Sequence, residues 1–291
     1  MFTSNGGIGF AIAKELCQKF DGTVYMTARD EERGKAAVGE LEKLGLKPAF
    51  HQLDIDSLDS IKAFRKYLES THGGIDVLVN NAAIAYKNNA TEPFGEQAEN
   101  TVRVNFLGTL NVCNELFPLL RKHARVAHVS SSAGHLMKIN GQEPAATELR
   151  KRFSNPEATV EQIIELANEF IKLAKEGTHN AAGWPNSTYM VSKVTLSALV
   201  PIQQRAFDKE RPDDDIVVNS CHPGYVDTDM TSHQGPLTIE EGAVAPVYLA
   251  LLPPNVEKPR GAYHSPTSLW SSESKGTPAE SKFIIESNTP V

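Results

Sequence analysis

At 291 residues the chain is long enough for one large α/β domain, and its net charge of −7 without any basic block argues against a nucleic-acid partner. Its three cysteines, Cys17, Cys113 and Cys221, lie far apart without a CxxC pair, which argues against a zinc site or a disulfide framework. No apolar run is long enough to span a bilayer and the start lacks a secretory pattern, so we expect a cytoplasmic protein.

Two kinds of apolar segment alternate from the N-terminus onward. Short β-branched runs predict strands at residues 23–27, 49–53, 76–80, 125–130 and 215–221. Longer stretches with helical spacing predict helices at residues 10–20, 31–44, 58–69, 98–120 and 187–207. This alternation predicts a doubly wound, Rossmann-like α/β fold, in which helices cover both faces of a parallel sheet. Ligands of such sheets bind at the carboxyl ends of the strands.

Two regions depart from this alternation. A polar insertion at about residues 135–183 contains one amphipathic helix, predicted at about residues 160–175. After Pro253 the chain is rich in Pro, Ser and Gly, and a loop-rich tail is expected from about residue 265. Residues 1–291 are therefore expected to form a single domain.

A glycine cluster opens the first predicted helix with the sequence Gly6-Gly7-Ile8-Gly9. Glycines at this place let a phosphate approach the backbone N–H groups of the helix, although a plain loop would have the same composition. Arg29 follows the next predicted strand. A cation there suits a 2′-phosphate and points to NADP(H), although a solvated helix start is the ordinary alternative.

Three further strand ends and helix faces carry polar groups. Tyr189 and Lys193 lie four residues apart on one helix face, where an ammonium lowers a phenol pKa that is otherwise about 10, but chance surface pairs share this spacing. Ser131 follows a strand and suits a developing oxyanion, or forms a serine turn. Asn81 is expected to support a cofactor loop. The histidines show no metal-ligand spacing, so no metal is expected.

These features occur along the chain in an order that resembles that of a known protein family. It runs from the glycine loop and Arg29 through Asn-Asn-Ala, Val-Asn-Phe-Leu-Gly-Thr, Val-Ser-Ser and Tyr-x-x-x-Lys to Pro-Gly-Tyr-Val-Asp-Thr. In this order the chain resembles the short-chain dehydrogenase/reductase superfamily, and within it the monomeric NADPH-dependent carbonyl reductases of animals. The resemblance extends from about Ser4 to about Ser265, with similar stretches at residues 51–56, 76–82, 183–185 and 246–254.

The resemblance implies NADPH-dependent reduction of ketones, aldehydes and quinones to alcohols. It implies a catalytic tetrad of Asn105, Ser131, Tyr189 and Lys193. In that tetrad the tyrosine donates the proton, the serine polarises the carbonyl, the lysine lowers the tyrosine pKa and the asparagine holds a relay water. Cofactor contacts are implied at Asn5, Gly7, Ile8, Gly9, Arg29, Asp54, Ile55, Asn81, Tyr189, Lys193, Val226 and Thr228. Substrate contacts are implied at Tyr86, Lys87, Gln97, Ser131 and Tyr225.

Two regions bear on the assembly and completeness of the fold. In the carbonyl reductases an insertion covers the helix through which other family members pair, so a monomer is expected. The family begins with a central strand that ends in Thr-Gly, whereas Thr3 stands here at the first glycine position. The first strand is therefore expected to be missing, as from a shortened gene model or an isoform. Weak NADPH binding and low stability would follow.

Two other functions compete with carbonyl reduction. One is a catalytically impaired, N-terminally truncated form that acts as a binding protein, which the missing strand favours and the intact tetrad opposes. The other is a sugar-nucleotide epimerase, which shares Tyr-x-x-x-Lys but has a larger C-terminal substrate domain than this tail provides.

Overall fold

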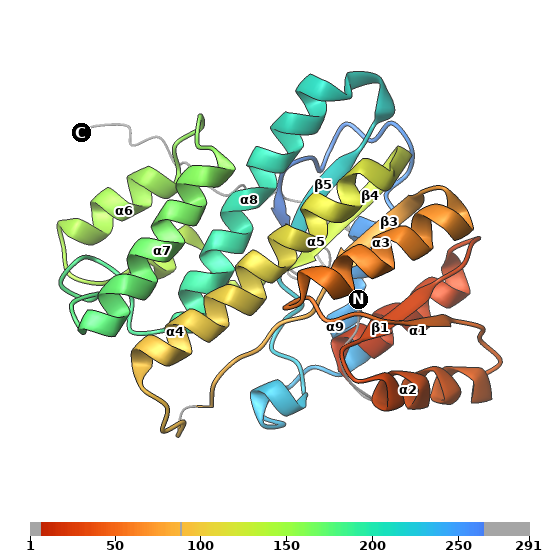
Figure 1. Ribbon diagram of the computed structural model, residues 1–291, viewed down its shortest axis with the longest axis horizontal. Coiled ribbons are helices and arrows are strands. Elements are labelled where there is room, and N and C mark those ends of the chain that lie inside the picture. The colour runs from red at the N-terminus through yellow and green to blue at the C-terminus, as the bar shows by residue number, and fades with distance from the viewer. Residues whose placement is uncertain (1–6, 88, 265–291) are drawn as a thin grey trace.

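The computed structural model describes residues 7–87 and 89–264, in which strands and helices alternate (Figure 1). The strands are β1 (Tyr25–Ala28), β2 (Ala49–Gln52), β3 (Ile75–Asn80), β4 (Leu120–Val129), β5 (Val217–Cys221) and β6 (Tyr263–His264). The α-helices are α1 (Ile8–Lys19), α2 (Glu31–Lys43), α3 (Leu58–His72), α4 (Phe94–Val102), α5 (Thr109–Leu116), α6 (Ala145–Phe153), α7 (Val160–Glu176), α8 (Thr188–Glu210) and α9 (Ile239–Ala250). Within these ranges, no helix combines the length and the apolar character that a membrane crossing needs.

Every strand pair is parallel, which confirms the predicted Rossmann-like α/β fold. One sheet has the order β3-β4-β5-β6, and β1 pairs separately with β2. In the four-stranded sheet Leu78 lies opposite Val126, and Val126 lies opposite Val218. The middle strand β5 is buried along its whole length, as expected for a parallel sheet that is covered on both faces.

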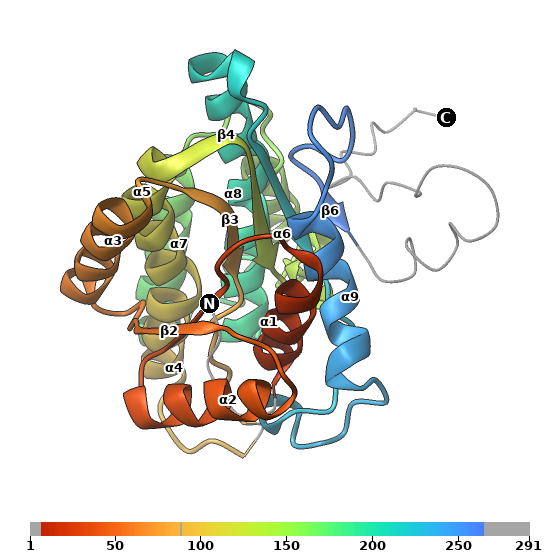
Figure 2. The same cartoon turned by 90° about the vertical axis from the view of Figure 1, so that its right-hand side faces the viewer.

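Helices cover both faces of the sheets (Figures 1 and 2). On one face α1 packs beside α9, and their residues Ile12 and Leu249 join Val79 and Ala127 of the sheet in one core cluster. The other face carries α3, α5 and α8. The insertion packs there too, since Phe170 of α7 belongs to a second cluster with α4 and α8. Both faces of the sheet therefore have their own apolar layer.

The structure corrects several predicted boundaries. The helix predicted at 98–120 is α4, a π-helical turn at Arg103–Gly108 and α5, which ends at Leu116 because Pro118 follows in a 3-10 turn. β4 begins at Leu120, earlier than the predicted residue 125. The insertion contains α6 as well as the predicted α7. α9 and the two-residue strand β6 were not predicted.

The described residues contain no strand before α1, and residues 1–6 lie outside them. The tail expected from residue 265 also lies outside. What the structure does show is that no strand of the described part joins β1 to β3.

Candidate active site

A cleft of about 700 Å³ lies beyond the carboxyl ends of β4 and β5, where a sheet of this type binds ligands. Residues from five separate stretches of chain line it. The lining side chains with polar or aromatic groups are Tyr86, Lys87, Asn89, Ser130, Ser131, Ser132, Tyr189, His222, Tyr225, Thr228, Thr231, Ser232 and Gln234. The predicted proton donor Tyr189 and the predicted carbonyl-polarising Ser131 therefore share one cavity.

Tyr189 stands in the first turn of α8. The N-cap residue Ser187 fixes the start of that helix, because its Oγ accepts a hydrogen bond from the Met190 N–H at 3.3 Å. Burial raises the pKa of Tyr189 to about 12, and a hydrogen bond with Ser131 acts in the opposite direction. This direction is opposite to the lowered pKa that the sequence predicted, because burial destabilises the phenolate.

Lys193 lies one helical turn after Tyr189 and is 3% exposed. Its Nζ donates to the Val129 carbonyl at 2.9 Å and lies 5.6 Å from the centroid of the Tyr189 ring. Burial lowers the pKa of Lys193 to about 8. The hydrogen bond to the Val129 carbonyl at the end of β4 holds the ammonium beside the phenol. The sheet and the helix therefore fix the position of the pair together.

Ser131 follows the last residues of β4. Its Oγ accepts from the Ala133 N–H at 3.1 Å, and its carbonyl accepts from the Tyr263 hydroxyl at 3.0 Å. The preceding Ser130 contacts Ser197 of α8 at 2.8 Å between hydroxyl oxygens. Ser131 is thus fixed through both its hydroxyl and its carbonyl oxygen.

Asn105 lies in the π-helical turn between α4 and α5, a distortion that is frequent at functional sites. Its Oδ1 accepts from the Ile84 N–H at 2.8 Å. Its Nδ2 donates to the Ile84 carbonyl at 2.9 Å and to the Ser192 hydroxyl at 3.0 Å. Both amide hydrogens are therefore used to hold the loop after β3 against α8. The relay water predicted for this residue stays a prediction.

The glycine loop residues lie at the start of α1. Gly7 is the N-cap residue with extended φ and ψ of −95° and 179°, and it has no side chain that could accept from the first-turn N–H groups. Ile8 lines the cleft and Gly9 is buried in the helix. Unsatisfied N–H groups at a helix start are suited to phosphate oxygens. Asn5 lies outside the described residues.

The other predicted cofactor residues follow strand ends. Arg29 comes directly after β1, where its carbonyl accepts from Gln52 at 3.1 Å and its side chain has no ion-pair partner within the described ranges. Asp54 and Ile55 follow β2, and Asn81 follows β3. Asn81 thus stands at the carboxyl end of the sheet beyond which the cleft opens, whereas the other three follow the separate β1–β2 pair. None of the four lines the cleft.

The structure also locates Val226 and Thr228, and both line the cleft. The backbone of Val226 forms an isolated bridge with Leu237. Thr228 begins a short turn in which its N–H donates to the Thr231 hydroxyl at 3.1 Å. This turn places the predicted nicotinamide contacts in the wall of the same cleft that Tyr189 lines.

Of the predicted substrate residues, Tyr86, Lys87 and Tyr225 line the cleft together with Ser131. Lys87 bridges it, since its Nζ donates to the Asp229 carbonyl and to the Ser232 hydroxyl, the latter at 2.9 Å. Gln97 is not among the lining residues, and its amide instead donates to the Glu92 carbonyl at 2.8 Å. The structure therefore does not bring Gln97 together with the other predicted substrate residues, and its substrate contact stays a prediction.

Two residues near the reacting groups were missed as site residues from the sequence. Tyr263 comes from the two-residue strand β6, which gave no strand pattern, and fixes the Ser131 carbonyl. His222 lines the cleft, and burial lowers its pKa to about 4, so it is neutral at pH 7. Its Nδ1 accepts from the Gly224 N–H at 3.3 Å, which leaves the proton of the neutral ring on Nε2.

Comparisons with known proteins find relatives in both sequence and fold. The chain is similar to carbonyl reductase (NADPH) 3 of Rattus norvegicus, with 47% identity over 89% of this chain and 92% of the relative. It is also similar to carbonyl reductase (NADPH) 1 of Homo sapiens, with 46% identity over 90% of this chain and 93% of the relative. The solved structure of salutaridine reductase from Papaver somniferum matches with a TM-score of 0.78 and 28% identity, covering 91% of this chain and 99% of that one.

A family model described as short chain dehydrogenase matches residues 3–146, which include the glycine loop, Asn105 and Ser131. The similarity to the relatives covers 89% and 90% of this chain, and stretches of that length include the helix that carries Tyr189 and Lys193. The chain therefore belongs to the short-chain dehydrogenase/reductase family.

Proposed function

We propose that this protein uses NADPH to reduce the carbonyl group of ketones, aldehydes and quinones to an alcohol. The observation that carries the proposal is the convergence of Ser131 and Tyr189 on one cleft, with the Lys193 ammonium 5.6 Å from the phenol ring. An acid beside a cation and a hydroxyl suited to an oxyanion are what carbonyl reduction requires. The names of the similar carbonyl reductases, which include NADPH, support the same cofactor.

The residues at the helix and strand ends fit the cofactor. The first-turn N–H groups at Gly7, Ile8 and Gly9 would hold the phosphates. The cation of Arg29, which has no ion-pair partner among the residues that the structure describes, would bind the 2′-phosphate. Residues at the other strand ends and in the turn after β5 would contact the adenine, the ribose and the nicotinamide, namely Asp54, Ile55, Asn81, Val226 and Thr228.

NADPH, when bound, supplies the hydride for the carbonyl carbon. Tyr189 donates its phenolic proton to the carbonyl oxygen, and its raised pKa of about 12 keeps that proton in place at neutral pH until the oxygen gains charge. The Ser131 hydroxyl donates a second hydrogen bond to the same oxygen. The Lys193 ammonium then stabilises the phenolate that remains, a role that a group pinned to the Val129 carbonyl performs without reorganising.

The experiment follows NADPH absorbance with menadione as substrate, for the wild type, Tyr189→Phe and the remote control Tyr248→Phe. The phenol hydroxyl is the proposed proton donor, so Tyr189→Phe is expected to lower kcat by about 100- to 10,000-fold. Equal rates for the wild type and Tyr189→Phe would overturn the role of Tyr189.

A binding protein without catalysis is the second candidate, and one observation favours it. β1 and β3, whose ends carry predicted cofactor residues, belong to separate sheets in the described part of the chain. No menadione reduction by any of the three proteins, together with a cooperative melt, would support this candidate.

We also propose a monomer in the cytoplasm. Phe170 of α7 and Leu199 of α8 belong to one apolar cluster, so the insertion occupies a face of α8 that would otherwise be open for pairing. Light scattering on the eluting protein is expected to give the mass of one 31.8 kDa chain.

A further inference from the structure

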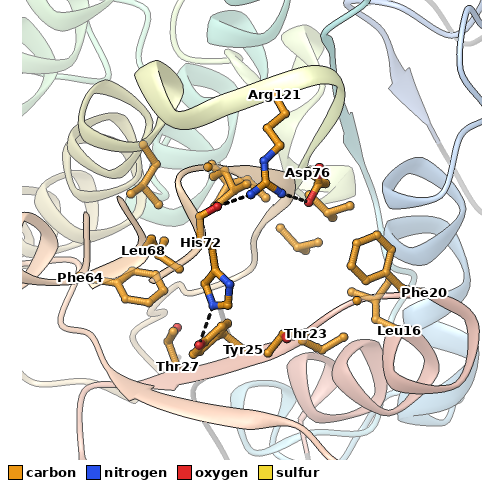
Figure 3. Close-up of a pocket in the computed structure, with 18 of the residues that line it drawn as sticks. Leu16, Phe20, Thr23, Tyr25, Thr27, Phe64, Leu68, His72, Asp76 and Arg121 are labelled. Carbon is orange, nitrogen blue, oxygen red and sulfur yellow. Dashed lines mark hydrogen bonds and ion pairs between the residues drawn. The ribbon is translucent and has the colours of Figure 1, made fainter. Parts of the chain in front are cut away.

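The catalytic cleft contains a polar side chain that is only half paired. In a second cavity, between β1 and β3, polar side chains pair with one another (Figure 3). There Arg121 bonds to Asp76 at 2.7 Å, and the His72 ring contacts the Tyr25 hydroxyl at 2.8 Å. In the catalytic cleft, by contrast, the Tyr86 hydroxyl accepts a hydrogen bond, but no residue within 7–87 and 89–264 accepts the hydrogen of that hydroxyl.

The pairing of Asn100, near the end of α4, fixes the direction of the hydrogen bond to Tyr86. The Nη2 of Arg103 donates to the Asn100 Oδ1 at 3.0 Å. A guanidinium can only donate, so the amide oxygen must face Arg103 and the amide Nδ2 faces the Tyr86 oxygen, at 2.8 Å. An amide nitrogen also only donates. The Tyr86 oxygen is therefore the acceptor, and its own hydrogen is kept for another group.

The loop that carries Tyr86 is held in place on both sides of this contact. Arg103 is fixed in turn by the segment after β2, because its Nη1 donates to the Asp56 carboxylate. Two residues before Tyr86, both the N–H and the carbonyl of Ile84 bond to the side chain of Asn105, at 2.8 and 2.9 Å. The phenol is thus positioned by the same helical turn that carries a residue of the proposed tetrad.

The free hydrogen of Tyr86 is placed to reach the contents of the cleft. Tyr86 lines the cleft and Asn100 does not, so the amide approaches the phenol oxygen from behind the cleft wall. Ser131 and Tyr189 line the same cleft and are the proposed partners of the carbonyl oxygen that is reduced. A substrate held by these two groups leaves the rest of its surface for contacts with the other walls.

We propose that Asn100 is a positioning residue that directs the Tyr86 hydroxyl to donate a hydrogen bond to a second acceptor of the substrate. The inference rests on the proposed carbonyl reduction and narrows its substrates to carbonyl compounds with a second acceptor, such as diketones and quinones. A half-buried donor without a partner favours a ligand that accepts over a ligand of the same shape that does not, because the second ligand leaves the donor unpaired.

The first test compares ketones of the same shape with and without a second acceptor. Diacetylbenzene is used as its meta and para isomers, and in each matched isopropenylacetophenone a methylene group replaces one acetyl oxygen. The preference is the ratio of the two kcat/KM values, measured by NADPH consumption. For at least one isomer, Tyr86→Phe is expected to lower the wild-type preference for the diketone about ten-fold, since only the diketone loses a hydrogen bond.

The control for this test is Tyr248→Phe, the same change on α9 and outside the cleft, which is expected to keep the wild-type preference. If these ketones are not reduced, their inhibition constants against menadione give the preference instead. An unchanged preference in Tyr86→Phe for both isomers would overturn the inference while leaving carbonyl reduction intact. Absence of menadione reduction by the wild type would overturn the proposed function, and the inference with it.

The second test reverses the hydrogen bond without removing the hydroxyl. In Asn100→Asp the carboxylate still accepts from Arg103, which supports the fold, but it also accepts from Tyr86 and turns the phenol hydrogen away from the substrate. We expect the same loss of preference as in Tyr86→Phe, and no further loss when both changes are combined. A residue that only supported the fold would lower kcat/KM for both ketones alike.

The matched control for Asn100→Asp is Asn114→Asp. Asn114 is exposed on α5 and does not line the cleft, so the same added charge is expected to leave the preference unchanged. A melting curve establishes that each variant is folded. If folded Asn100→Asp keeps the wild-type preference for the diketone, Asn100 does not direct the Tyr86 hydroxyl and the inference is wrong.

Discussion

The part of the molecule that carries the proposed proton donor differs from the part expected to hold the cofactor phosphates. The proposed catalytic side chains Ser131, Tyr189 and Lys193 follow β4 or lie on α8, beside a sheet that continues without a break from β3 to β6. The glycine loop and Arg29 flank α1 and β1, and β1 has a strand partner on one side only among the described strands. Strand β5 is buried throughout, whereas β2 is half-buried at every position. Chemistry and cofactor binding therefore depend on two parts whose structural support is unequal.

Buried polar contacts stabilise the part built on the unbroken sheet from β3 to β6, which we call the continuous part. His128 of β4 contacts Asn80 of β3 at 3.3 Å and Gln203 of α8 at 3.0 Å. Arg125 at the start of the β4 pairing with β5 is buried and bonds to Asp215 at 2.9 Å. Since unpaired buried polar groups are costly, these networks admit few alternative arrangements. We expect perturbations in this part to be larger than those in the β1–β2 part.

The largest expected effect on stability comes from replacing Asp215. Burial alone would raise its pKa, but hydrogen bonds from His123, the Asn255 N–H and Arg125 bring it to about 2. Asp215→Asn leaves the buried Arg125 without its counter-charge and is expected to lower the free energy of unfolding by about 3–5 kcal/mol. Urea denaturation measures this. Asp214→Asn, which breaks only a partly exposed pair with Arg211, should cost under about 1 kcal/mol.

Acid is expected to weaken the continuous part next. Burial lowers the pKa of His128 to about 4 in the folded protein, below its ordinary value of 6.5. Its contribution to stability is complete above pH 6.5 and is lost as the pH falls from 6.5 to 4, because the unfolded chain binds the proton first. The loss amounts to roughly 3 kcal/mol. Unfolding curves between pH 7 and 4 measure this loss. If the free energy of unfolding of His128→Gln changes with pH as steeply as that of the wild type, another group is responsible.

The pH dependence of catalysis tests the buried lysine. With a pKa of about 8, Lys193 loses its charge as the pH rises above 8, whereas Tyr189 with a pKa of about 12 stays protonated there. If the ammonium is required, kcat for menadione falls about ten-fold per pH unit above that value. A steady-state profile from pH 6 to 10 measures this. A flat profile would remove the lysine charge from the mechanism.

The smallest expected effect lies in the β1–β2 part. Arg29→Ala removes a cation without an ion-pair partner in the described chain, so the fold should be unaffected. The variant is expected to bind NADPH about ten-fold more weakly and NADH as before, because one charge-assisted hydrogen bond to the 2′-phosphate is lost. Fluorescence titration with both nucleotides measures the two affinities. An equal loss for both would indicate that Arg29 supports the loop and does not bind the phosphate.

The sequence could place Tyr189 and Lys193 beside each other because a helix fixes the relation between residues four apart. It could not place Gln97, since the face that a residue presents on α4 depends on packing against α7 and α8. Tyr263 could not be predicted as a site residue for another reason. It lies 132 positions from Ser131, and a two-residue strand has no periodicity to read.

The pairing of Arg125 has a consequence for the order in which the chain becomes stable during synthesis. The side chain bonds to Asp215, which is 90 residues later, and to the carbonyls of Leu252 and Pro253, which are 127 and 128 residues later. While the ribosome is still adding these segments, Arg125 and the edge of β4 remain exposed beside Val126 and Ala127. The nascent protein therefore passes through a long interval in which this strand must be shielded until almost the whole described chain has emerged.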